Sequence, residues 1–187
     1  PNGGGKTSLL RTILRLQSPT KGRISFFRQG EPVSSLDMGY LPQKNSIDSR
    51  FPITVEEVVA SGLMGNTQKG NTKFDSKKEI DGMLDLMGIT ALRNKPIGVL
   101  SGGQLQRSLF GRALISKPEM LILDEPASYI DRQFGNRMFE ILRDLSSNGT
   151  TIMMVSHEIE PFITLSNRNL YILSLIHISE PTRPISI

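Results

Sequence analysis

One short stretch of the chain, residues 120–125 with the sequence MLILDE, constrains the fold more than any other. Four apolar residues in a row are typical of a strand that is buried on both faces, as in a parallel sheet. Two acidic residues, Asp124 and Glu125, follow and therefore lie at the carboxyl end of that strand. Ligands of open α/β sheets bind at this edge. The stretch predicts an α/β fold with a mostly parallel sheet and an acidic site at the sheet edge.

Signals for helices and strands alternate along the rest of the chain, as expected for such a fold. Helices are predicted from apolar periodicity and from capping signals, and strands from short apolar runs between turns. The predicted helices are 6–16, 54–61, 75–87 and 131–146, and the predicted strands are 23–27, 39–43, 120–123 and 151–155. Residues 52–112 are expected to form a mostly helical insertion.

The composition excludes several classes of function. The 187 residues contain no cysteine and two histidines, His157 and His177, which excludes disulfides and leaves too few ligands for a zinc cluster. No apolar run reaches about 18 residues, the length that a membrane-spanning helix needs. The formal net charge of +4 comes from scattered Lys and Arg, so no nucleic-acid partner is expected.

The chain opens with a glycine-rich turn before a predicted helix. Residues 1–7, PNGGGKT, match the end of the phosphate-binding pattern G-x-x-x-x-G-K-[ST], and we expect the chain to begin inside this motif. Backbone N–H groups of such a turn and the positive end of a helix both bind phosphate oxygens. The residues expected to contact a nucleotide here are Asn2, Gly3, Gly4, Gly5, Lys6, Thr7 and Ser8.

Asp124 and Glu125 supply the acidic groups that a phosphate loop needs for Mg²⁺ and for the attacking water. We expect Lys6 to reach the β- and γ-phosphates, and Thr7 and Asp124 to hold Mg²⁺. Glu125 is placed to polarise a water for attack on the γ-phosphate. Two solvated acids that merely close a strand are the alternative, which the presence of Lys6 and Thr7 disfavours.

Residues 100–104, LSGGQ, narrow the class of nucleotide enzyme. Ser101 and Gln104 predict a capping box, and Gly102 and Gly103 leave backbone N–H groups bare at the helix start. This would be a second phosphate-binding surface. One nucleotide does not need both surfaces of one chain. Two chains packed head to tail do, because each offers this surface to the γ-phosphate bound by the other.

The order of these motifs resembles that of ATPases of the ABC family, and the resemblance covers residues 1 to about 173. LSGGQ is similar to the family's signature motif. The resemblance implies that Gln43 touches Mg²⁺ and the attacking water, that 127–131 contact the other copy of a dimer, and that His157 contacts the γ-phosphate. It also implies a preceding antiparallel β-subdomain with an aromatic residue that stacks on adenine. We expect this part to be missing, so that the fragment binds ATP weakly or not at all.

The resemblance further implies partners and a location. These are a homodimer of ATPase subunits, integral-membrane permease subunits and an extracytoplasmic solute-binding protein, with the ATPase on the cytoplasmic face of the cell membrane. Residues 39–48, GYLPQKNSID, and 51–55, FPITV, are similar to those of zinc and manganese importers. An ATPase of an iron–siderophore importer, or of another importer, is the nearest alternative.

Functions of other classes fit less well. DNA-repair members carry a long coiled coil between the phosphate motif and the signature, whereas Lys6 and Ser101 are fewer than 100 residues apart without sustained heptads. Translation factors join two cassettes, and one is present here. A nucleotide-binding module without turnover is disfavoured because Glu125 and His157 are both present.

Residues 174–187 follow no pattern of the preceding chain. They contain two prolines close together and have no clear period, and the stretch is similar to a translated transposase-based sequencing adapter. We therefore expect residues 1–173 to be the partial ATPase domain and the last residues to be a non-native tail.

Overall fold

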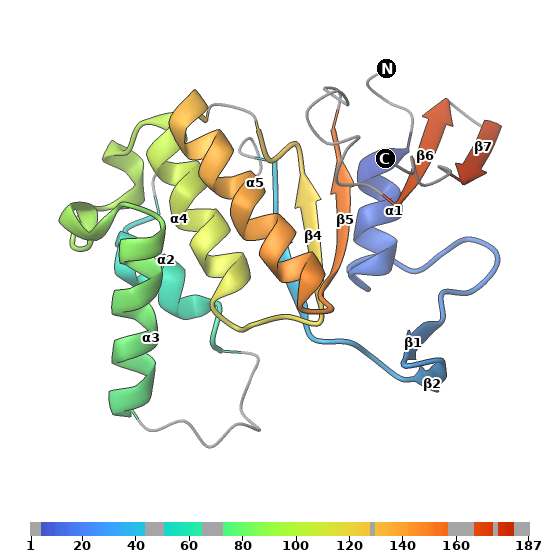
Figure 1. The fold of residues 1–187 in the computed structure, drawn as a ribbon, viewed down its shortest axis with the longest axis horizontal. Coiled ribbons are helices and arrows are strands. Elements are labelled where there is room, and N and C mark those ends of the chain that lie inside the picture. Colours follow the sequence, from blue (N-terminus) through green and yellow to red (C-terminus); the bar gives the residue numbers. More distant parts are fainter. Residues whose placement is uncertain are drawn as a thin grey trace. The chain divides into compact units, whose positions relative to one another are not determined.

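The computed structural model describes residues 5–43, 51–64, 73–127, 130–156, 167–173 and 176–181 (Figure 1). The chain divides into two compact units, one of residues 1–32 with 156–187 and one of residues 33–155, and each is described by itself. The elements in chain order are α1 Lys6–Ile13, β1 Phe26–Arg28, β2 Glu31–Val33, β3 Met38–Leu41, α2 Val55–Ser61, α3 Lys73–Leu86, the 3₁₀ turns η3 Thr90–Leu92 and η4 Ile97–Val99, α4 Gly102–Leu114, β4 Met120–Asp124, α5 Arg132–Ser147, β5 Thr151–Val155, β6 Arg168–Leu173 and β7 Ile176–Pro181.

The larger unit contains a three-stranded parallel sheet in the order β3-β4-β5. Its register pairs Leu41 with Leu123 and Asp124 with Val155. The carboxyl ends of all three strands therefore meet at one edge. The predicted α/β fold with a parallel sheet is confirmed, and β5 has the predicted bounds.

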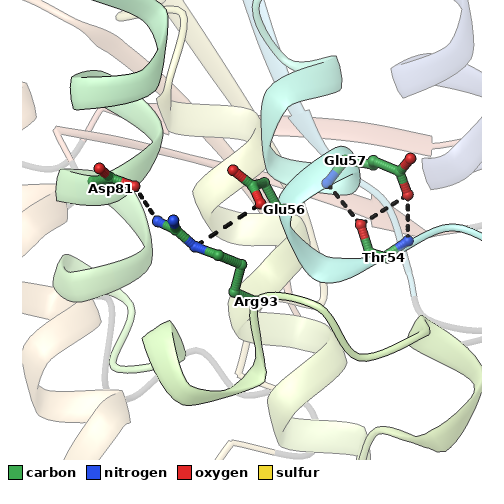
Figure 2. Close-up of polar contacts among 5 residues, drawn as sticks. All are labelled: Thr54, Glu56, Glu57, Asp81 and Arg93. Atoms are coloured by element: carbon green, nitrogen blue, oxygen red, sulfur yellow. Dashed lines mark hydrogen bonds and ion pairs between the residues drawn. The ribbon is translucent and has the colours of Figure 1, made fainter.

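Helices fill most of the described chain between β3 and β4. At the start of α2, Thr54 accepts a hydrogen bond from the Glu57 N–H at 3.3 Å, and the Glu57 carboxylate accepts one from the Thr54 N–H at 2.8 Å (Figure 2). This is the predicted capping box, and α2 ends at Ser61 as expected. Figure 2 also shows the Arg93 guanidinium between Asp81 of α3 and Glu56 of α2, with Nε 3.9 Å from the Glu56 carboxylate.

Helix α4 connects this helical region to the sheet. Its buried side chains belong to one core that also contains residues of α2, α3, α5, β3 and β4. In Figure 1, α4 lies beside α5 on one side and close to α2 and α3 on the other. It packs tightly on β3 at Gly39, where an added Cβ atom would collide with the Ala113 carbonyl of α4. The position of α4 is thus fixed by both the sheet and the other helices.

The smaller unit contains α1, the antiparallel sheet β6-β7 and, apart from Val33, the two-stranded sheet β1-β2. Helix α1 ends at Ile13, three residues earlier than expected, because Arg15 adopts a left-handed backbone with φ 59°. The Arg15 guanidinium lies 5.2 Å from the centre of the buried Phe26 ring. The predicted strand at 23–27 begins only at Phe26, and β2 was not predicted. Strand β7 falls in the stretch expected to be a non-native tail, and the origin of that stretch stays a prediction.

Among the described residues no helix is both long and apolar enough to cross a membrane.

Candidate functional site

Of the predicted phosphate loop, the structure describes Gly5, the N-cap of α1, and the first helical residues Lys6 and Thr7. Gly5 adopts φ 83°, a left-handed conformation that costs side-chain-bearing residues about 1–2 kcal/mol, and its carbonyl accepts the first helical hydrogen bond, from the Leu9 N–H at 2.9 Å. Thr7 and Ser8 are exposed in the first turn, and Lys6 is half-buried. The first N–H groups of a helix have no intrahelical acceptor, which is why helix starts commonly bind anions. The predicted contacts from Asn2, Gly3 and Gly4 lie outside the described residues.

The two carboxylates lie at the end of β4 in different environments. Asp124 is the last strand residue, and 4% of its surface is exposed. Glu125 leaves the strand with φ 53°, in the left-handed region that is strained for a residue with a side chain. Its N–H donates a hydrogen bond to the Val155 carbonyl at 2.8 Å, and its Oε1 atom is shielded from solvent. Strained residues of this kind cluster at functional sites because the surrounding structure has to hold them in place.

The parallel sheet brings a further predicted residue to the same edge. Gln43 follows β3 by two residues and is exposed. Since Leu41 pairs with Leu123, the chain leaves β3 and β4 at the same end of the sheet, which places Gln43 and Glu125 on segments that emerge together. His157 would follow β5 at this edge, but it lies outside the described residues.

The predicted capping box at the start of α4 is present. Ser101 is the N-cap, and its hydroxyl accepts a hydrogen bond from the Gln104 N–H at 3.3 Å. The Gln104 side chain in turn accepts one from the Ser101 N–H at 3.0 Å. Gly102 and Gly103 are the first two helical residues and are partly exposed. Their N–H groups belong to the set that has no acceptor within the helix.

Two residues that the sequence analysis did not name connect α4 to the chain that follows Glu125. Gln106 is 1% exposed and donates from Nε2 to the Pro126 carbonyl at 3.2 Å. Arg107 forms a hydrogen-bonded ion pair with Asp131 and lies 4.4 Å from the centre of the Phe134 ring. The only sequence signal was their place within three residues of the end of the LSGGQ stretch, which does not predict what they contact.

Asp131 is the N-cap of α5 and lies at the end of the 127–131 stretch, of which residues 128 and 129 are outside the described part. Its carboxylate accepts a hydrogen bond from the Phe134 N–H at 2.9 Å. This hydrogen bond, and next the one from Arg107, lower the pKa of Asp131 below its ordinary value. The carboxylate is thus stabilised in its charged form at the loop that precedes α5.

Lys6, Thr7 and Ser8 belong to the smaller unit, whereas Gln43, Ser101, Asp124 and Glu125 belong to the larger one. Within the larger unit, the structure brings together the segments that carry Gln43, Asp124 and Glu125, and α4 contacts the chain after Glu125. That Lys6 and Thr7 meet these groups around one nucleotide stays a prediction.

Comparison with known proteins identifies the family. The family model described as ABC transporter matches residues 1–128. The chain is 39% identical over 175 residues, or 91% of its length, to a Chlamydia pneumoniae protein named "Probable metal transport system ATP-binding protein", of which it covers 71%. It is 38% identical over 174 residues, or 89% of its length, to the zinc uptake system ATP-binding protein ZurA of Listeria monocytogenes, of which it covers 67%.

Solved structures agree on the fold. The dimeric ATP-binding cassette MJ0796, bound to ADP and Pi, is similar with a TM-score of 0.81 at 23% identity, and the similarity covers 99% of this chain and 84% of that one. The family model matches more than half of the chain, and the two relatives match it over most of its length. Together these matches show the family. The chain belongs to the ABC transporter family, as an ATP-binding subunit.

Proposed function

We propose that this ATP-binding subunit hydrolyses MgATP at Glu125 and that hydrolysis powers the import of a divalent metal ion, zinc or manganese. The observation that carries the proposal is the turn at the end of β4. There, Glu125 is held in a strained conformation by a hydrogen bond to β5, next to the segment that carries Gln43. A carboxylate fixed at the ligand-binding edge of a parallel sheet suits a group that orients a water.

The donor groups fit MgATP. The N–H groups around Gly5 and the ammonium of Lys6 suit the phosphates, with Asn2, Gly3, Gly4 and Ser8 as further contacts. The hydroxyl of Thr7, the buried carboxylate of Asp124 and the amide of Gln43 could each supply an oxygen ligand. Mg²⁺ takes one or two such protein ligands together with phosphate oxygens, so these residues would hold it. When bound, the ion neutralises charge on the β- and γ-phosphates.

In the proposed reaction, Glu125 accepts a hydrogen bond from a water that attacks the γ-phosphorus. The bond from phosphorus to the β–γ bridging oxygen breaks, and ADP leaves with that oxygen. Lys6 lowers the barrier by stabilising the charge that spreads over the transferred group, and His157 contacts the γ-phosphate. The hydrogen bond from the Glu125 N–H to the Val155 carbonyl holds the backbone that carries this carboxylate at the sheet edge.

A second copy of the chain completes the proposed site. The first N–H groups of α4, at Gly102 and Gly103, form a phosphate-binding surface together with Ser101 and Gln104. We propose that this surface binds the γ-phosphate held by the phosphate loop of the other copy. The similarity in fold to a dimeric cassette bound to ADP and Pi supports this arrangement.

The proposed partners follow from the family. An ATP-binding subunit of a transporter acts through permease subunits in the membrane, so the proposed location is the cytoplasmic face of the cell membrane. An importer would also use an extracytoplasmic solute-binding protein. Both relatives described above carry names that refer to metal or zinc transport, which supports a metal ion as the cargo.

Steady-state phosphate release by the complete gene product tests the hydrolysis. We expect Glu125→Gln to lower kcat by about 10²- to 10⁴-fold, the range for loss of a general base, without loss of ATP binding. Glu140→Gln is the matched control, because Glu140 is exposed on α5. Normal turnover by Glu125→Gln would contradict the role of Glu125. Nucleotide binding by the parent protein without any turnover would instead indicate a binding module.

Uptake of radioactive zinc, manganese and ferric siderophore by cells with and without the gene tests the cargo. The proposal predicts that loss of the gene lowers zinc or manganese uptake, that the parent gene restores it and that Glu125→Gln does not. A defect confined to siderophore uptake would assign the chain to the alternative class of importer.

A further inference from the structure

A buried polar side chain lies in the middle of α4, away from its N-terminus. Gln106 is 1% exposed, and its amide nitrogen donates to the carbonyl of Pro126 at 3.2 Å. Its Oε1 atom is also buried and has no hydrogen-bond partner within the described ranges. A methionine or leucine would fill this position without burying such an oxygen. Burying an unpaired polar atom costs about 1–3 kcal/mol. What the glutamine supplies in return is a hydrogen-bond donor for the Pro126 carbonyl.

The acceptor of this hydrogen bond is the residue directly after Glu125. The N–H of Glu125 is bound to the Val155 carbonyl on β5, and the carbonyl of the next residue is bound to α4. The strained Glu125 backbone is therefore held from both sides, by the sheet and by a helix. A left-handed residue with a side chain persists only where its surroundings hold it.

A second connection lies one residue further along α4. Arg107 is ion-paired with Asp131, whose carboxylate caps α5, and packs on the ring of Phe134. Gln106 and Arg107 therefore attach both ends of the 126–131 segment to α4. Helix α4 is continuous from Gly102 to Leu114, so the Ser101 N-cap and the two residues that contact this segment belong to one helix.

We propose that Gln106, assisted by Arg107, is a positioning residue for hydrolysis. Its hydrogen bond to Pro126 holds the turn that carries Glu125, so that this turn moves together with α4. The inference rests on the proposed function of Glu125 and extends it: contact of the LSGGQ surface with a second copy's nucleotide is communicated through α4 to the group that orients the water. Neither residue is expected to touch ATP.

The test compares hydrolysis with nucleotide binding in the complete gene product. Gln106→Met keeps the length and shape of the side chain but cannot donate to Pro126. The expected result is a drop in kcat of about 10-fold, the equivalent of one hydrogen bond lost from the turn, with Kd for ATP within about twofold of the parent. Amide hydrogen exchange in the peptide that contains Glu125 should become faster.

Ser108→Ala is the matched control. Ser108 is fully buried on the same helix and its hydroxyl donates to the Gln104 carbonyl at 2.9 Å, within α4. The control therefore loses a buried hydrogen bond without touching the turn, and its kcat should stay within about twofold of the parent. An equal drop in kcat for both variants would mean that general loosening of α4 is responsible, which overturns the proposal.

An unchanged kcat in Gln106→Met would also overturn the proposal, as would a parallel loss of kcat and ATP affinity. If Gln106→Met does not fold, Arg107→Met gives the same comparison at the other end of the segment, where the side chain is partly exposed. Glu125→Gln distinguishes failure of the proposed role of Glu125 from failure of the positioning role of Gln106. Normal turnover in Glu125→Gln means that the proposed function fails, whereas its inactivity beside a normal Gln106→Met means that only the positioning role fails.

Discussion

A Cβ atom placed on Gly39 would lie 2.1 Å from the carbonyl oxygen of Ala113. The backbone of α4 therefore rests directly on β3, with no room for a side chain between them. This contact sets the height of α4 over the sheet. Since Gln106 reaches the chain after Glu125 from the same helix, the distance between α4 and the sheet also decides whether that hydrogen bond forms.

We expect Gly39→Ala to lower the free energy of unfolding by about 1–3 kcal/mol, because the new methyl group meets a backbone carbonyl that cannot move away cheaply. Gly82→Ala is the control. Gly82 lies within α3, and a Cβ there would meet no atom within 4 Å, so alanine should stabilise the helix by about 0.5–1 kcal/mol. Urea unfolding of both variants checks the pair, and a Gly39→Ala protein as stable as the parent contradicts the packing described.

The two capping boxes allow the structural and functional roles of Ser101 to be separated. Both Ser101→Ala and Thr54→Ala remove an N-cap hydroxyl, which costs about 1 kcal/mol. Only Ser101 lies on the proposed phosphate surface, so only Ser101→Ala should also lower ATPase activity, by more than about fivefold. Thermal unfolding and phosphate release, measured on both proteins, provide the comparison. Equal loss of activity in the two variants would indicate a purely structural role for Ser101.

Stability should fall on acidification through two identified carboxylates. The pKa of Glu57 is lowered by its hydrogen bonds from the Thr54 N–H and hydroxyl, and that of Asp131 by the Phe134 N–H and then by Arg107. A lowered pKa in the folded state means that the stabilisation is fully present above the unfolded-state pKa, near 4, and is lost as pH falls further through the folded-state pKa.

Glu57→Gln and Asp131→Asn should therefore lower the melting temperature at pH 7 and flatten its dependence on pH below about 4. Both amides keep a side-chain oxygen for the cap, so the charge alone is removed. Melting curves between pH 7 and pH 3 measure the effect. Variants that lose stability on acidification as steeply as the parent would show that other carboxylates are responsible.

Local signals predicted the parts of this fold that local interactions determine. The capping boxes at Thr54 and Ser101 fixed the starts of α2 and α4, and the apolar runs before Asp124 and after Thr150 marked β4 and β5. The sequence did not reveal β2, because Pro32 cannot donate to a ladder and argues against a strand.

The contacts of Gln106 and Arg107 could not be predicted for a different reason. Gln106 contacts a residue 20 positions away in the sequence, and Arg107 contacts one 24 positions away. Only the packing of α4 against α5 and the sheet edge brings these residues together. A glutamine two residues after the LSGGQ stretch has no periodicity or motif that reveals a buried donor. The proposed site residues could be named from the sequence because phosphate chemistry restricts their types and spacing, and their roles stay predictions.

Sedimentation of the Glu125→Gln protein with and without MgATP tests most directly whether two copies sandwich two nucleotides for hydrolysis. The complete gene product carrying this substitution is predicted to be monomeric without nucleotide and to form a stable dimer with two ATP molecules when MgATP is added. The same dimer should not persist in the parent protein, which hydrolyses its ATP. A Glu125→Gln protein that binds ATP and stays monomeric at saturating nucleotide would contradict the account.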